Sequence, residues 1–285
     1  MNFRSDLALE CRDPKRAAPG VEFRQEDTPE YHISHLHITN SKGAQTLGKP
    51  VGRYITIELP PIGDYTELYG AGMERAALEL RQMLPASGTV LVVGLGNSSM
   101  TPDALGPRCC AQVMATRHIG GELAKSAGLG TLRAVTCLTP GVVGRTGIES
   151  GELISAAVRE VCPAAVIAVD ALAARQLSRL GCTVQITDSG IVPGSGVGNA
   201  RLEISEKTLG VPVVSVGVPT VVDAATLVSS LTDGQPKTEN CETMMVTPRE
   251  VDLLIERATK ILSMAINRAL QPHLSVQDFF VLIDP

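Results

Sequence analysis

The chain has 285 residues, a formal net charge of −5 and no run of Lys or Arg, which argues against a nucleic-acid or anionic-membrane surface built from basic patches. Aromatic residues make up only 3% and Trp is absent, which argues against recognition by stacking on bases or sugars. The first residues lack the apolar core of a signal peptide, and no apolar run reaches membrane-spanning length. We therefore expect a soluble cytoplasmic protein that binds neither nucleic acid nor membrane.

Sequence periodicity predicts the elements of the N-terminal third. Residues 1–30 are polar and charged, with no sustained period, and are interpreted as a flexible leader. Apolar and polar residues alternate over 32–39 and 53–59, which predicts a pair of antiparallel strands. Apolar residues recur at helical spacing over 65–84 and lead into a continuous apolar run at 90–96, which predicts a helix followed by a central strand.

The rest of the chain alternates between strand and helix patterns. Short β-branched runs predict strands at 132–137, 165–170, 183–187 and 211–218. Helices are expected over 103–117, 151–161, 171–180 and from a capping box at Thr247-Pro248-Arg249-Glu250 to about residue 270. This order predicts an α/β fold, a three-layer sandwich with a mostly parallel central sheet, plus a small N-terminal β-hairpin region.

Two of the apolar strands lead into an aspartate. Asp103 follows the first run by way of Gly94-Leu95-Gly96-Asn97, and Asp170 ends the run at 165–170. Because ligands and chemistry gather beyond the carboxyl ends of parallel strands, both carboxylates are candidates for a shared acid–base site. Each could instead only cap a helix, Asp103 within Thr101-Pro102-Asp103 and Asp170 ahead of the helix expected after it.

Other residues that could carry chemistry suit structural roles. The seven Cys show no C-x-x-C spacing and are interpreted as reduced structural thiols. His32, His35 and His37 share one face of a predicted strand, and no cluster of Cys and His indicates zinc. Asp223 is expected to cap a helix that begins near Ala224. We expect neither a metal nor another cofactor.

A glycine-rich loop follows the strand at 183–187. Its residues 194–199 have the spacing G-x-G-x-G, whereas a dinucleotide fingerprint needs G-x-G-x-x-G between a strand and a helix. Close approach of the backbone to an extended peptide explains the glycines as well, with Gly194 and Gly196 as substrate contacts. Asp188, just before this loop, is expected to bind substrate or support the site rather than act as a principal catalyst. A non-catalytic phosphate-binding module stays an alternative.

Several longer segments form a pattern. They are Gly94-Leu95-Gly96-Asn97 with Thr101-Pro102-Asp103-Ala104-Leu105-Gly106-Pro107, Asp170-Ala171-Leu172-Ala173-Ala174-Arg175, Pro193-Gly194-Ser195-Gly196-Val197-Gly198-Asn199, Gly217-Val218-Pro219-Thr220-Val221-Val222-Asp223-Ala224 and Met245-Val246-Thr247-Pro248. In this order they resemble the signatures of the germination proteases, the spore endopeptidases. The resemblance extends from about Arg4 to near Leu270.

This resemblance implies an endopeptidase that initiates the degradation of small acid-soluble, DNA-protecting spore proteins during germination, in the cytoplasm of the forespore and the spore core. It implies Asp103 and Asp170 as the catalytic pair, with Asn97 beside them, and a homotetramer as the assembly. The segment 229–243 is shorter than the insertion expected there in the family, so the resemblance does not extend to substrate access or regulation by that insertion.

The chain also resembles the hydrogenase maturation peptidases, which bind a metal. Their motif is Gly-x-Gly-Asn, then four residues, then two acids, and it is matched here with Pro102 and Asp103 in the acid positions. Their metal-binding His after the third strand is replaced by Cys137-Leu138-Thr139-Pro140-Gly141. Two carboxylates without the imidazole make a poor transition-metal site, so metal dependence is not expected. A metal-dependent maturation peptidase or amidase of this fold stays an alternative.

The leader contains the segment Asp6-Leu7-Ala8-Leu9-Glu10, which resembles the sites that germination proteases cut in their substrates. The family is made as zymogens that remove a short N-terminal segment. We therefore expect self-processing between Asp6 and Leu7, with 1–6 as a propeptide and 7–285 as a single α/β peptidase domain. An accidental match in a disordered tail is the alternative.

Overall fold

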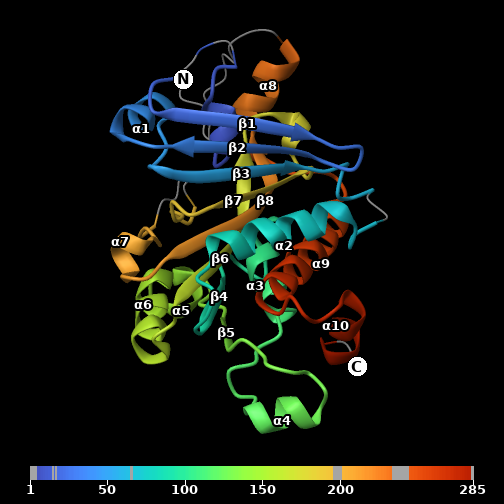
Figure 1. Cartoon of the computed structure of the whole chain (residues 1–285). Helices are drawn as coiled ribbons and strands as arrows, with labels where there is room; N and C mark the ends of the chain where they lie inside the picture. Colours follow the sequence, from blue (N-terminus) through green and yellow to red (C-terminus); the bar gives the residue numbers. More distant parts are fainter. Residues whose placement is uncertain are drawn as a thin grey trace.

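A computed structural model describes the chain in residues 5–14, 16, 18–64, 67–194, 201–232 and 244–283. In these residues nine strands form one sheet. Eight of them follow the order β1-β2-β3-β7-β8-β6-β4-β5 (Figure 1), and β9 pairs with β8 outside that path. No helix of the same residues is long and apolar enough to cross a membrane. The expected α/β class is confirmed, and all the described strands belong to a single sheet.

The parallel strands lie together at one end of the sheet. They are β4 (Val90–Gly94), β5 (Val135–Leu138), β6 (Ala165–Ala174) and β8 (Val213–Asp223). β4 pairs in parallel with β5 and β6, and β6 pairs in parallel with β8. Every residue of β4 is buried, because this part of the sheet is covered on both faces, and its sequence is accordingly a continuous apolar run.

The remaining strands pair antiparallel. They are β1 (Val21–Asp27), β2 (His32–Ile38), β3 (Gly52–Glu58), β7 (Thr183–Thr187) and β9 (Met245–Val246). The sheet is therefore mixed, and the prediction of a mostly parallel sheet is wrong. The connection from β6 to β7 holds only the 3₁₀ turn η3 (Leu177–Arg179), whereas a crossover that would keep β7 parallel needs a dozen or more residues.

The N-terminal region has regular structure where it is described. β2 and β3 form the expected antiparallel pair, with His32 opposite Glu58 and Ile38 opposite Gly52. They continue the main sheet through β7 rather than stand as a separate region. The prediction of a flexible leader over 1–30 is wrong for the described part, because β1 and the 3₁₀ turn η1 (Ala8–Cys11) lie within it.

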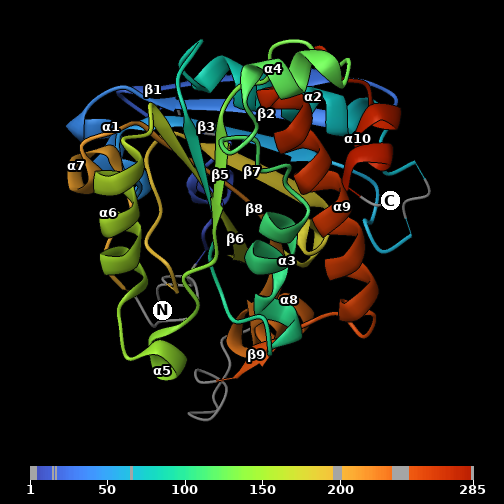
Figure 2. The ribbon, with the colours of Figure 1, turned by 90° about the horizontal axis from the view of Figure 1, so that it is seen from below.

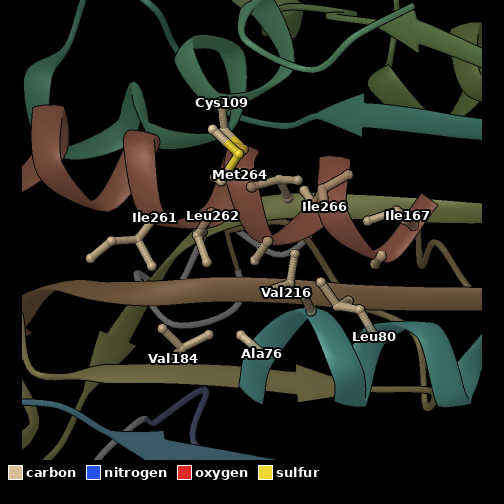
Figure 3. Close-up of a cluster of buried hydrophobic side chains, with 14 of the residues drawn as sticks. Ala76, Leu80, Cys109, Ile167, Val184, Val216, Ile261, Leu262, Met264 and Ile266 are labelled. Carbon is tan, nitrogen blue, oxygen red and sulfur yellow. The ribbon is translucent and has the colours of Figure 1, made fainter. Parts of the chain in front are cut away.

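Two buried clusters lie on opposite faces of the parallel strands. Val90 and Val92 of β4 belong to one cluster, and Leu91 and Val93 to the other. The larger cluster is completed by α2 (Ala71–Met83), α3 (Leu105–Ala111), α9 (Val251–Leu270) and α10 (Val276–Ile283), and the smaller by α6 (Ser150–Val161) and α7 (Glu206–Leu209). Figure 2 shows α6 and α9 on the two sides of the sheet, and Figure 3 shows side chains of α2 and α9 meeting those of β7 and β8.

The shorter helices sit at the margins of this core. They are α1 (Ser41–Leu47), α4 (Gly121–Ser126), α5 (Val143–Thr146) and α8 (Ala224–Thr232). Of the helices expected from sequence, those at 65–84 and 151–161 are found as α2 and α6. The helix expected over 103–117 is shorter, because the 3₁₀ turn η2 (Thr101–Asp103) precedes α3 and α3 ends at Ala111.

One expected helix is a strand. β6 continues beyond Asp170 to Ala174, where it pairs with Val222 of β8, so the helix predicted directly after Asp170 is wrong and this carboxylate does not cap a helix. Pairing with a long neighbouring strand outweighs the helical propensity of the Ala-rich segment. Asp223 does cap α8 as predicted, since its Oδ1 accepts a hydrogen bond from the Thr226 N–H at 2.7 Å.

Candidate active site

Asp103 lies on a tight loop that begins where β4 ends. Its Oδ2 accepts a hydrogen bond from the backbone N–H of Asn97 at 2.8 Å, and its backbone carbonyl accepts from the same N–H at 3.1 Å. Gly96 makes this approach possible, because its φ is +111° and a Cβ there would lie 2.1 Å from the Asp103 carbonyl oxygen. The segment Gly94-Leu95-Gly96-Asn97 therefore holds Asp103 in place.

Asp170 lies within β6, just past the end of β4. It is 6% exposed, and its Oδ1 accepts a hydrogen bond from the Ala171 N–H at 2.9 Å. The pairing of β4 with β6 runs only as far as Gly94, opposite Val169. The carboxylate thus lies at the C-terminal edge of the parallel strands, where chemistry was expected from the sequence.

Thr220 holds the Asp103 loop and is itself held by Thr247, and the sequence analysis assigned neither threonine to the site. Thr220 Oγ1 donates a hydrogen bond to the Pro102 carbonyl at 2.8 Å, and Thr247 Oγ1 donates to the Thr220 carbonyl at 2.9 Å. The capping box predicted at 247–250 is therefore wrong, and α9 begins at Val251. Thr220 lies in one of the segments that resemble the family's signatures, but no periodicity or spacing marks its role, because a buried Thr in a strand is common.

Both aspartates line one cavity of about 620 Å³. Its walls come from the loop after β4, from β6, from the loop after β7 and from β8. Asn97 and Gly194 also line it, so the structure brings these two expected site residues to the pair. Gly196 lies outside the described residues.

Asp188 is placed elsewhere. Its Oδ1 accepts a hydrogen bond from the Arg53 N–H at 2.7 Å, and its Oδ2 pairs with the Arg53 Nε at 2.7 Å. It does not belong to the residues that line the cavity. Asp188 therefore ties the loop after β7 to β3, and the structure does not bring it to the aspartate pair.

Burial raises the pKa of both carboxyls of the pair. At Asp103 this effect is opposed by the hydrogen bond from Asn97, which favours the ionised form. At Asp170 burial raises the pKa well above its ordinary value, and the negative charges of Asp103 and Asp6 raise it further. The two carboxyls are therefore unequal, and Asp170 holds its proton more tightly.

Asp6 and Leu7 lie beside this pair. Asp6 lines the cavity, its Oδ2 accepts a hydrogen bond from the Ala173 N–H at 2.8 Å, and its own N–H donates to the Ala173 carbonyl at 2.9 Å. The Leu7 side chain is completely buried in a cluster with Leu172, Ala174 and Val222. The peptide bond between Asp6 and Leu7 therefore lies at the edge of the cavity, as the predicted self-processing requires.

Among the described residues no group of three or more His, Cys, Asp or Glu side chains is arranged to hold a metal ion. The thiol of Cys137 interacts with that of Cys110. The hydrogen bond between the two thiols and burial raise the pKa of Cys137. The chemistry that these residues offer is proton transfer by a pair of unequal carboxyls.

Among solved structures, a NiFe hydrogenase maturation protease, HycI, from Thermococcus kodakarensis is similar to this chain at 17% sequence identity. The similarity has a TM-score of 0.38 and covers 66% of this chain and 98% of that chain. A similarity of this size supports no argument about this chain.

Sequence relatives are far closer. A model of the germination protease family matches residues 4–234. The germination protease of Clostridium perfringens is 38% identical over 97% of this chain and 98% of its own length, and that of Caldanaerobacter subterraneus is 40% identical over 99% and 98%. That of Priestia megaterium is 44% identical over 81% of this chain and 66% of its own length. The resemblance found in the sequence is thereby confirmed, and the chain belongs to the germination protease family.

Proposed function

We propose that this protein is an endopeptidase that initiates the degradation of small acid-soluble, DNA-protecting spore proteins during germination, and that Asp103 and Asp170 carry out the hydrolysis. Membership of the germination protease family supports both peptide hydrolysis and its timing at germination. The observation that carries the assignment of residues is the unequal pair of buried carboxyls in one cavity. The forespore and the spore core are the proposed compartment, and a homotetramer is the proposed assembly.

Peptide hydrolysis without a nucleophilic side chain needs an activated water and a proton for the leaving amine. In the proposed mechanism Asp103 is ionised and takes the proton from the water, because the Asn97 N–H stabilises its negative charge. Asp170 is protonated, because burial and its acidic neighbours disfavour its charge. The Asp170 O–H donates a hydrogen bond to the carbonyl of the cut peptide bond and polarises it. The proton that Asp103 takes from the water then passes to the leaving amine. No metal takes part in these steps.

We further propose that the protein is made as a zymogen that cuts itself between Asp6 and Leu7, so that 1–6 is a propeptide and 7–285 the peptidase domain. The position of Asp6 at the cavity of the aspartate pair supports this proposal. N-terminal sequencing of wild type after mild acid incubation should find Leu7 at the new terminus. Asp103→Asn incubated alone should keep its original terminus.

The decisive experiment compares cleavage of a small acid-soluble spore protein by wild type, Asp103→Asn and Asp170→Asn, with folding checked by circular dichroism. Either substitution removes one ionisable group from the pair at constant side-chain shape. We expect turnover to fall by about 10³-fold or more in both variants. A wild-type rate in either folded variant would refute the assigned roles. Activity that a chelator abolishes and a divalent ion restores would favour a metal-dependent peptidase instead.

A further inference from the structure

The leader is bound along a part of β6 that lies beyond its pairing with β4. That pairing ends at Gly94, opposite Val169. Four residues further along β6, Ala173 exchanges hydrogen bonds with Asp6: the Asp6 N–H donates to the Ala173 carbonyl at 2.9 Å, and the Ala173 N–H donates to the Asp6 carboxylate at 2.8 Å. One main-chain hydrogen bond and one bond to the Asp6 carboxylate therefore hold the leader at the edge of β6.

Two side chains from the antiparallel part of the sheet (β1, β2, β3 and β7, with the loops that join them) bind the carbonyls of this segment. Lys49 Nζ donates to the Ser5 carbonyl at 2.7 Å and to the Asp6 carbonyl at 3.3 Å. Gln185 Nε2 donates to the Asp6 carbonyl at 2.9 Å, while Gln185 Oε1 accepts from the Ala8 N–H at 3.0 Å. Gln185 therefore contacts the peptide on both sides of the bond between Asp6 and Leu7. Its side chain is buried, since the residue is only 5% exposed.

The contacts after that bond do not depend on Asp6. The Leu7 side chain is completely buried. The Glu10 carboxylate accepts hydrogen bonds from the N–H groups of Arg175 at 2.7 Å and Gln176 at 2.8 Å. A substrate whose cut bond takes the place of the bond between Asp6 and Leu7 needs the sites of residues 7–10 as well, so the leader has to leave them after the cut. Lys49 Nζ and Gln185 Nε2 would then lose the carbonyls that they bind.

Asp6 also separates two cavities. It lines the cavity of the aspartate pair and a second cavity of about 300 Å³, to which Lys49 and Gln185 belong. Leu172 and Ile191 are walls of both cavities as well. Departure of Asp6 would therefore remove one of the walls that lie between the aspartate pair and the two donors.

We propose that Lys49 and Gln185 bind the main-chain carbonyls directly before the cut bond, first in the leader and then in the protein substrate. Gln185 Nε2 donates to the carbonyl of the cut bond itself, where it adds to the polarisation by Asp170 and stabilises the charge that develops on the oxygen. Lys49 positions the carbonyl one residue earlier. The substrate's residue before the cut takes the place of Asp6, with its side chain at the Ala173 N–H. This inference rests on the proposed function.

The test uses the processed wild-type protein, Lys49→Met and the matched control Lys42→Met, which removes an exposed Lys from nearby α1. The substrate is a peptide containing Ser-Asp-Leu-Ala-Leu-Glu, and a second peptide carries a thioamide in place of the Ser carbonyl. Because sulfur accepts hydrogen bonds poorly, the thioamide should lower kcat/KM about tenfold in wild type and in Lys42→Met. In Lys49→Met the parent peptide should already lose about tenfold, and the thioamide should add nothing.

Rescue of the parent rate by Lys49→Arg would support a donor role over a role in folding. An unchanged thioamide effect in Lys49→Met would overturn the inference while wild-type cleavage upheld the proposed function. For Gln185→Met, kcat should fall with little change in KM, since its donor serves the reacting carbonyl. A change in KM alone would contradict that role.

A second measurement does not require activity. In full-length Asp103→Asn, hydrogen exchange at the amides of Asp6 and Ala173 should become faster when Lys49→Met is added, and should stay unchanged with Lys42→Met. Unchanged exchange with Lys49→Met would overturn the inference even if no spore protein were cleaved. Absence of cleavage by wild type would refute the proposed function, and the role of both donors in substrate cleavage with it.

Discussion

The two parts of the sheet differ in burial, and they contribute different things to the site. β4 is buried throughout and β6 nearly so, whereas most of β1 is exposed. The parallel part supplies both aspartates at its C-terminal edge. The antiparallel part supplies the donors to the leader, with Gln185 on β7 and Lys49 just before β3.

We propose that this difference separates chemistry from peptide binding. Burial raises the pKa of a carboxyl, and the covered strands provide this burial at Asp170. An extended peptide needs a strand edge and donors that can be reached from outside, which the junction of the two parts provides at Ala173. The predictions below test the contrast, from the largest expected effect to the smallest.

The tight packing of the parallel part should be broken by Gly106→Ala. A Cβ at Gly106 would lie 2.2 Å from the Leu95 carbonyl oxygen and 2.4 Å from that of Val169, so α3 would have to move away from the strands. We expect the free energy of unfolding, measured in urea, to fall by about 3 kcal/mol or more. Gly144→Ala is the control, because no atom lies within 4 Å of its added Cβ. An equal loss of unfolding free energy in the two variants would contradict the tight packing of the parallel part.

The docking of the leader should be broken by Leu7→Ala, measured in the Asp103→Asn background so that processing does not interfere. Leu7 is completely buried, and its truncation should lower the free energy of unfolding by about 2–4 kcal/mol. Leu9→Ala, at a half-buried position in the same segment, should have a clearly smaller effect. If the two truncations were equally mild, the leader would not be part of the folded core.

The burial of Asp170 should appear as a pH dependence of stability. Because its pKa is raised, Asp170 keeps its proton in the folded protein at pH values where the unfolded chain has released it. The free energy of unfolding of wild type therefore falls as the pH rises from about 4. Asp170→Asn lacks this effect. The variant should gain on wild type by up to about 1.4 kcal/mol per pH unit towards neutrality. A difference that stays constant from acid to neutral pH in urea titrations would contradict the assignment.

The ion pair between Arg53 and Asp188, on the surface of the antiparallel part, should contribute least to stability and activity. The side chains of Arg53 and Asp188 are 48% and 27% exposed, so solvent screens their interaction. Arg53→Met should lower the free energy of unfolding by less than about 1 kcal/mol. Cleavage of the spore protein should remain within about twofold of wild type. A tenfold loss of activity would show that Asp188 acts on the aspartate pair after all.

Sequence patterns predicted the elements whose signal is local. The apolar run of β4, the helix α6 and the cap at Asp223 depend on neighbours within a few residues, and all three are confirmed. The helix expected after Asp170 failed because pairing with β8 outweighs local propensity there. The capping box at Thr247 failed because its hydroxyl binds a carbonyl distant in sequence, that of Thr220.

The sequence by itself determined that two aspartates end up at one sheet edge, since continuous apolar runs become covered parallel strands and their ends share an edge. Only the tertiary structure decided what surrounds that pair. The approach of Asp6 to Asp170, the hold of Lys49 and Gln185 on the leader and the bond from Thr220 to Pro102 all join residues far apart in the chain. The residue types that make these contacts are common, and no periodicity or spacing in the sequence predicts them. Contacts between residues far apart in the chain depend on how the whole sheet packs.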